Sequence, residues 1–255
     1  SKMDDAKFKK EIGDAVIKKC IEALGRIRAG IQLLVEDDIS FDAFCFMNRS
    51  MILQRNIMNF SKKHGAGIEC AFRDFVDPRN PSNNFGWRPF QIAFILMNLK
   101  GIVDPEHDNR EVVDLLYFPT GGGKTEAYLG LMAFVIANRR LRADENDEYN
   151  RDGGVTAILR YTLRLLTTQQ RDRITKMILA AELIRQKEYP KYGKEPISIG
   201  FWVGGTVTPN TFKELEEDPE DPAKTRTARS KKNSIYKQLL TCPFCGKPLT
   251  EENFY

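Results

Sequence analysis

The feature that most constrains this chain is a glycine-rich loop between an apolar run and a helical stretch. Residues 118–125 read FPTGGGKT, after the apolar run 112–118 and before residues 126–141, which are apolar nearly all round, as in a helix buried beside a sheet. Glycines let backbone N–H groups and the positive end of the following helix approach a polyphosphate closely. Lys124 would reach the β- and γ-phosphates and the Thr125 hydroxyl would ligate Mg²⁺. The loop departs from the strict pattern in having Phe118 at its first position, where that pattern has glycine.

A second candidate contact lies some 30 residues upstream, where residues 87–91 read WRPFQ. A glutamine amide offers a donor and an acceptor to the adenine edge, so Gln91 would select ATP, with Arg88 or Trp87 packing near the base. The alternative is that these residues only begin a helix. The expected cofactors are ATP and Mg²⁺. We expect Lys124 and Thr125 to be catalytic and the nucleotide to contact Arg88, Gln91, Thr120, Gly121, Gly122, Gly123, Lys124, Thr125 and Glu126.

The order of apolar segments predicts an α/β fold. Residues 112–118, 154–159 and 197–203 are typical of short buried strands, and 126–141 and 163–181 of the helices between them. This order predicts a parallel RecA-like phosphate-loop sheet covered by helices. Helical stripes at 12–34 and 41–60 predict a helical N-terminal region over residues 1–86. Residues 87–241 would form a first, incomplete RecA-like ATPase domain, and 242–255 half of a zinc-ribbon insertion.

Candidate nucleic-acid contacts follow the second and third of these apolar runs. Arg160, Thr162 and Arg164 follow the second, and cationic side chains with amides at a helix start bind phosphate oxygens. Gly204 and Gly205 follow the third, where glycine permits close approach of a backbone. Salt-bridged surface arginines and a plain turn are the alternatives. The net charge of +4 is weak support for a nucleic-acid partner.

The five cysteines indicate a reducing compartment and a metal site, not a disulfide framework. Cys242 and Cys245, in the run TCPFCG, have the spacing of one zinc knuckle, and a structural Zn²⁺ needs four ligands. Two further parts of a motor ATPase are missing: an acidic motif after an apolar strand, and a second ATPase domain. We therefore expect an N-terminal fragment, inactive alone, of a longer protein that binds Zn²⁺. Neither a membrane span nor a signal peptide is expected.

Several runs together resemble a known family. Residues 87–96, 114–130, 160–167, 198–204 and 242–246, with 44–54 ahead of them, resemble the DrmA family, the helicase-like component of bacterial DISARM anti-phage systems. The resemblance implies a cytoplasmic, bacterial superfamily 2 DNA helicase or translocase, with DNA and a DrmB-like subunit as partners. It implies a role in anti-phage defence.

Two other functions remain open from the residues alone. A small-molecule or nucleotide kinase also uses a phosphate loop, but it would need an arginine-bearing lid and an acceptor pocket. A DNA- or protein-binding module could keep the loop only as a scaffold. The motor interpretation requires that Lys124 lie in a glycine bend at the edge of a parallel sheet.

Overall fold

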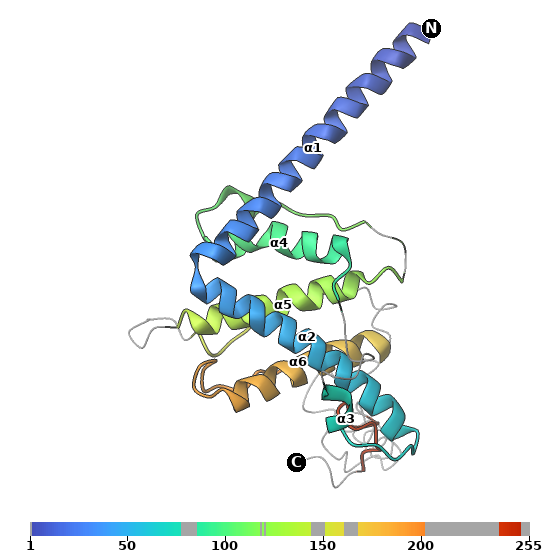
Figure 1. Ribbon diagram of the computed structural model, residues 1–255, viewed down its shortest axis with the longest axis vertical. Coiled ribbons are helices and arrows are strands. Elements are labelled where there is room, and N and C mark those ends of the chain that lie inside the picture. Colours follow the sequence, from blue (N-terminus) through green and yellow to red (C-terminus); the bar gives the residue numbers. More distant parts are fainter. Residues whose placement is uncertain are drawn as a thin grey trace, which may run out of the picture.

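The computed structural model describes residues 2–77, 86–117, 119, 121–143, 151–160, 168–201 and 240–250. Its helices are α1 (Lys2–Glu36), α2 (Asp38–Gly65), α3 (Arg73–Val76), α4 (Pro89–Val103), the short 3-10 helix η2 (Asp108–Glu111), α5 (Lys124–Leu141) and α6 (Thr168–Lys187). Figure 1 shows α2, α4, α5 and α6 stacked across one another, while the first half of α1 projects away from the stack. In this part of the chain no helix is long and apolar enough to cross a membrane.

Asp37 separates α1 from α2. Its backbone is extended, and its carboxylate accepts hydrogen bonds from Ile39 N at 3.2 Å and Ser40 Oγ at 2.7 Å. This is the arrangement of a helix N-cap, which satisfies donors at the start of a helix that have no intrahelical partner. The same carboxylate pairs with Arg142, directly after α5. The turn between the first two helices is thereby tied to the end of the helix that follows the phosphate loop.

α2 is the central helix of the stack. It packs most extensively against α5 and also against α6, α1 and α3. The hydrophobic core joins α2 to the later helices, and its fully buried members include Phe46, Met47, Ile95, Phe134 and Met177. The helical stretches expected at 12–34 and 41–60 are confirmed as α1 and α2, and both belong to the same packed unit as the phosphate-loop helix.

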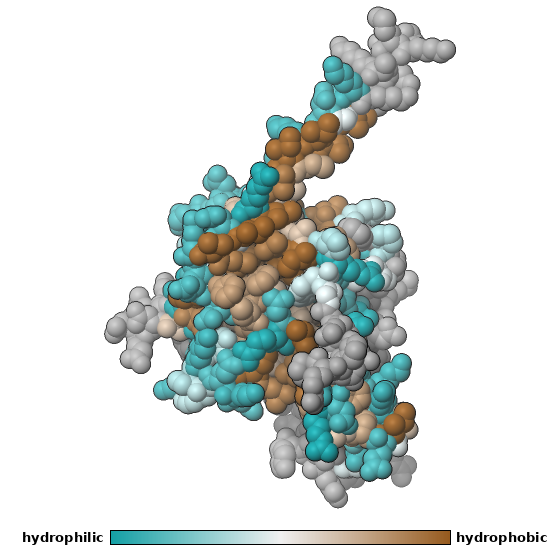
Figure 2. Space-filling view, viewed as in Figure 1, coloured by the Kyte–Doolittle hydropathy of each residue, from teal (hydrophilic) through white to brown (hydrophobic). Residues whose placement is uncertain are grey.

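α1 crosses α4 closely at its C-terminal half and is exposed at its N-terminal half. At Gly30, a Cβ atom would lie 2.0 Å from the carbonyl oxygen of Leu96, so only glycine allows this approach. Further out, the helix carries exposed apolar side chains, which form the brown patches along the projection in Figure 2. They include Ile12, Val16, Ile17, Ile21 and Leu24.

The expected parallel RecA-like sheet is wrong: the described residues contain no strand. Residues 112–117, 154–159 and 197–201 are irregular, and the one β-bridge recorded joins Thr241 to Pro248 in antiparallel fashion. Burial differs from the expectation as well. Val113 is 95% exposed, Tyr117 88% and Ile158 84%. The described part of the chain is a helical fold.

A physical reason accounts for this difference at residues 112–117. A β-strand exists only through hydrogen bonds to a neighbour, and an apolar run predicts a tendency to be buried without supplying that neighbour. Here the segment is fixed by a side chain instead. Arg26 of α1 donates two hydrogen bonds to the carboxylate of Asp114, at 2.7 and 2.6 Å. The segment that leads into the phosphate loop is therefore anchored to α1.

A buried polar network fixes the segment after α6 and joins it to Asp152, ahead of that helix. The Arg140 guanidinium donates to the carbonyl oxygens of Asp152, Tyr192, Glu195 and Pro196, at 2.6–3.3 Å. Arg185 and Glu182 of α6 form a bidentate pair, and Glu182 also accepts from Ile197 N at 2.8 Å. Since the backbone groups of an irregular segment need partners when buried, these side chains replace the hydrogen bonds that a sheet would provide.

Candidate nucleotide-binding site

The phosphate loop forms a glycine bend that leads directly into a helix. Gly121 and Gly123 have φ of 79° and 91°, values that side-chain-bearing residues rarely adopt. Gly122 N donates to Pro119 O at 3.0 Å, which closes the turn, and α5 begins at Lys124. The Lys124 ammonium lies 3.3 Å from the same Pro119 oxygen, so its side chain folds back along the loop. Phe118 and Thr120 lie outside the described residues.

Gln91 lies beneath the loop and contacts it directly. Its Oε1 accepts from the backbone N–H of Arg88 at 2.8 Å, and its Nε2 donates to Gly123 O at 2.7 Å. These two contacts define the orientation of the amide, because the flipped amide would place donor against donor and acceptor against acceptor. Gln91 is 5% exposed, so the contact is buried. A side chain expected to read the adenine edge thus also supports the loop.

Arg88 makes a second contact with the loop, since its Nη1 donates to Gly122 O at 2.7 Å. Two successive carbonyl groups, those of Gly122 and Gly123, are therefore occupied by donors from the start of α4. Carbonyl oxygens repel an anion, so a phosphate site needs them turned elsewhere. The N–H groups of the first turn of α5 have no intrahelical partners, and they stay available on the loop.

Trp87 packs against helices instead of standing open beside the loop. Its Nε1 donates to Asn48 Oδ1 of α2 at 2.7 Å, and its ring covers Gly130 of α5, where a Cβ atom would lie 2.6 Å from Cη2. Trp87 also borders the hydrophobic core. It therefore links α2 to α5, and of the two candidates for packing near a base, the structure leaves Arg88 more exposed at the loop.

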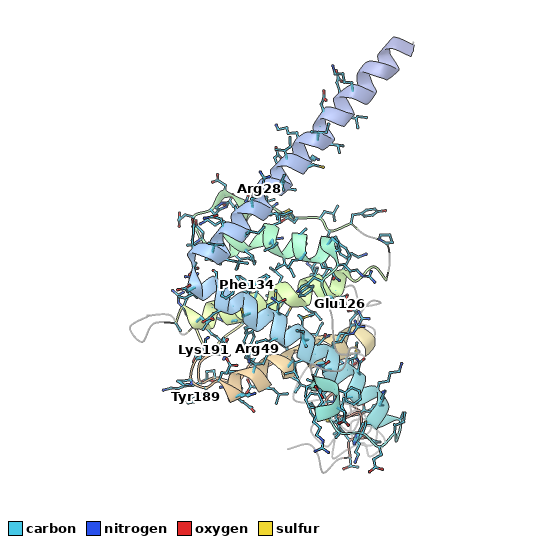
Figure 3. The ribbon with its side chains drawn as sticks, viewed as in Figure 1. Arg28, Arg49, Glu126, Phe134, Tyr189 and Lys191 are labelled. Carbon is cyan, nitrogen blue, oxygen red and sulfur yellow. The ribbon has the colours of Figure 1, made fainter. Side chains whose placement is uncertain are left out.

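Glu126, the third residue of α5, pairs with an arginine of α6. Arg173 Nη1 lies 2.9 Å from Glu126 Oε1, and the two side chains are 36% and 27% exposed. The other carboxylate oxygen, Oε2, would lie 3.4 Å from a Cβ atom on Gly123 and accepts no hydrogen bond among the described residues. Glu126 is labelled at the N-terminal end of α5 in Figure 3. A negative charge thus lies against the last glycine of the loop.

The candidate nucleic-acid residues fall mostly outside the described part. Arg160 is described and exposed at the end of an irregular segment. Thr162, Arg164, Gly204 and Gly205 lie outside the described residues. Arg160 stays a prediction from sequence.

The two knuckle cysteines lie in a tight turn packed on the end of α2. Cys242 O accepts from Gly246 N at 2.8 Å, and Gly246 has φ of 75°. His64 Nδ1 lies 2.8 Å from Cys245 O, so the turn touches α2 through a histidine. Around this contact, Phe244 packs with Phe60 and Phe72 at ring distances of 5.0–5.6 Å. Within the described residues no group of three metal-ligating side chains forms.

Sequence reasoning missed Arg173 as a partner of the phosphate loop. Arg173 and Glu126 are 47 positions apart, and neither belongs to a recognisable spacing. The contacts of Asn48 with Trp87 and of His64 with the cysteine turn were also missed. In each case the signal is a pairing across helices, which periodicity along one helix cannot show. An alignment with covarying positions would be the way to find them.

Comparison with known proteins identifies a similar protein. The chain is 47% identical over 248 residues to the DISARM protein DrmA of Bacillus paralicheniformis. The match covers 96% of this chain and 21% of that relative, so the chain spans about a fifth of the length of the protein it matches. A comparison with protein-family profiles finds no match. The resemblance expected from the quoted motifs is confirmed.

Proposed function

We propose, taking the similarity to the DISARM protein DrmA as the premise, that this chain carries the nucleotide-binding part of an ATP-dependent DNA helicase or translocase of superfamily 2 that acts in anti-phage defence. The observation that supports the proposal most directly is the loop. Gly123 adopts a left-handed conformation and α5 starts at the next residue, Lys124. The sequence also required that Lys124 lie at the edge of a parallel sheet, and this requirement is not met in the described residues, which contain no strand. The proposal therefore rests on the glycine bend, its contacts with α4 and the similarity to DrmA.

The residues present fit a triphosphate with Mg²⁺. The N-terminal end of α5 offers N–H groups and a positive partial charge, and the carbonyls of Gly122 and Gly123 are held by Arg88 and Gln91. Lys124 would exchange Pro119 O for phosphate oxygens, and the half-buried Thr125 would ligate the metal ion. Mg²⁺ would supply positive charge to offset the negative charge of the phosphates. The chain's own residues bind and orient the phosphates.

Adenine recognition by Gln91 is compatible with its loop contacts. A glutamine amide oxygen can accept two hydrogen bonds, and its nitrogen can donate two. In this structure Oε1 and Nε2 of Gln91 each form one. Gln91 would therefore bind the base and the loop together. We propose that it links occupancy of the base site to the conformation of the glycine bend.

DNA and a DrmB-like subunit are the proposed partners. Arg160, with Thr162 and Arg164 after it, would contact the phosphate backbone of DNA, and Gly204 and Gly205 would allow a second close approach. We also propose that Cys242 and Cys245 hold one side of a structural Zn²⁺ whose remaining ligands come from elsewhere in the longer protein. The hydrogen bonds that close their turn, from Gly246 N to Cys242 O and from Cys242 N to Lys247 O, and its packing on α2 fit that role.

Hydrolysis measured on the full-length protein tests this function. We expect DNA to stimulate ATP hydrolysis. Lys124→Ala should abolish hydrolysis, and Arg160→Ala should reduce its stimulation by DNA. DNA binding that ignores both ATP analogues and Arg160→Ala would favour a non-catalytic binding module. ADP production that needs a small hydroxylated acceptor and ignores DNA would favour a kinase.

A further inference from the structure

The carboxylate of Glu126 presents an electrostatic problem for the proposed ATP site. It belongs to the first turn of α5, beside Gly123, where a triphosphate would add several negative charges. At these separations like charges repel, and the repulsion is strong where solvent is partly excluded. The ammonium of Lys124 and the guanidinium of Arg88 also face the loop, but within the described part of the chain Glu126 pairs with Arg173.

We propose that Arg173 is a positioning residue for the nucleotide, acting through Glu126. Its guanidinium neutralises Glu126 and draws the carboxylate toward α6, so that the loop can accept a triphosphate. The inference rests on the proposed function, because it concerns the same site. Two observations carry it: Arg173 Nη1 contacts Oε1 at 2.9 Å, while Oε2 stays on the loop side, next to Gly123, without a hydrogen bond among the described residues.

Arg173 is held where this role requires it. It lies in the second turn of α6, and its backbone carbonyl accepts a hydrogen bond from Gln54 Nε2 of α2 at 3.4 Å. The next residue, Ile174, is buried in the core. The N-terminal ends of α4, α5 and α6 point to the same side of the stack, which places Arg173, Glu126 and Arg88 at one edge (Figure 1).

Titration of the full-length protein with a fluorescent ATP analogue and Mg²⁺ tests the pair. Arg173→Ala leaves an unpaired carboxylate on the loop, and we expect ATP affinity to fall by about tenfold, more at low ionic strength. Adding Glu126→Gln to that variant should return the affinity to within about threefold of wild type, because the repelling charge is gone. Arg173→Lys should keep most of the affinity, since it keeps the charge.

The rescue separates an electrostatic role from a merely structural one. A bridge that only holds α5 to α6 is broken in the double variant too, so its ATP affinity would stay as low as that of Arg173→Ala. That result, or an Arg173→Ala protein that binds ATP like wild type, overturns the inference. If Arg173→Ala does not fold, Glu126→Gln alone decides: tighter or equal binding supports the inference, and weaker binding contradicts it.

Two controls complete the experiment. Arg49→Ala breaks the pair of Arg49 with Glu188, which has similar exposure and lies away from the loop, so its ATP affinity should stay within about twofold of wild type. Lys124→Ala shows whether ATP binds at this loop at all. Equal binding by Lys124→Ala and wild type removes the proposed function itself, whereas loss in Lys124→Ala without the Arg173 pattern removes only this inference.

Discussion

Two buried charged side chains, Arg140 and Arg185, take backbone carbonyl groups as hydrogen-bond partners. Arg140 is 8% exposed, its partners among the described residues are carbonyl oxygens, and burial lowers the pKa of its guanidinium. Glu182 receives a backbone N–H together with Arg185. The sequence does not predict these buried hydrogen bonds. Arg140 lies in the last turn of α5, where an arginine is usually exposed to solvent. Lys124 and the loop glycines could be predicted, since their chemistry requires fixed neighbours in sequence.

Glu182 makes stability depend on pH. Burial opposes ionisation of its carboxyl group, but hydrogen bonds from Arg185, Ile197 N and Gln186 outweigh burial and lower the pKa to about 2. A lowered pKa means that the folded state binds fewer protons, so its contribution exists above about pH 4.5 and disappears as the pH falls toward 2. The contribution is on the order of 3 kcal/mol.

Urea denaturation between pH 2 and 7 checks this effect. The free energy of unfolding should fall as the pH drops below about 5, and Glu182→Gln should be less stable at pH 7 with a flatter profile. Glu11→Gln, on the exposed part of α1, is the matched control and should retain the profile of wild type. A Glu182→Gln profile parallel to that of wild type would show that another group carries the acid sensitivity.

Among the elements, the helices follow from the sequence and the irregular segments do not. The expected helices at 126–141 and 163–181 correspond to α5 and α6, because a 3.6-residue pattern is a local property of the chain. The three expected strands fail because pairing depends on a partner elsewhere, and residues 112–117 are tied to α1 through Asp114 instead. The close crossing of α1 and α4 at Gly30 could not be predicted either, since a glycine within a helix usually signals only a lower helix propensity.

Gly30→Ala tests that crossing. The new methyl group would lie 2.0 Å from a backbone oxygen of α4, so the helices must move apart, at a cost of about 1–3 kcal/mol in the free energy of unfolding. Gly25→Ala, five residues earlier in α1, has open space around the new Cβ atom. It should be neutral or stabilising by up to about 1 kcal/mol. Equal denaturation midpoints for the two variants would contradict the close packing.

In the whole molecule, α2 connects two distant features. Its middle packs against α5 of the phosphate loop, and its C-terminal end carries the cysteine turn through His64 and Phe60. Figure 1 shows this helix running from the end of α1 to the region of α3 and the last described residues. The sequence predicted the phosphate loop and the cysteine turn as separate features. Only the packing shows that one helix, α2, contacts both.

Phe244→Ala tests whether the cysteine turn is held by its aromatic contacts. Loss of the contacts with Phe60 and Phe72 should release the turn, so Cys242 and Cys245 should be alkylated several-fold faster, as measured by mass spectrometry of peptides. Cys45, which lies on α2 away from the turn, gives the internal reference. Unchanged rates at the two knuckle cysteines would show that hydrogen bonds alone hold the turn.

The central claim is that the bend at Gly121–Gly123 followed by α5 binds ATP. Calorimetric titration of this chain with MgATP, comparing wild type, Lys124→Ala and the surface control Lys100→Ala, tests it most directly. Lys124→Ala should lose more than the ~1.5–3 kcal/mol of a single charged hydrogen bond, since several phosphate contacts depend on this ammonium, while Lys100→Ala should bind like wild type. Identical binding isotherms for wild type and Lys124→Ala would contradict the account.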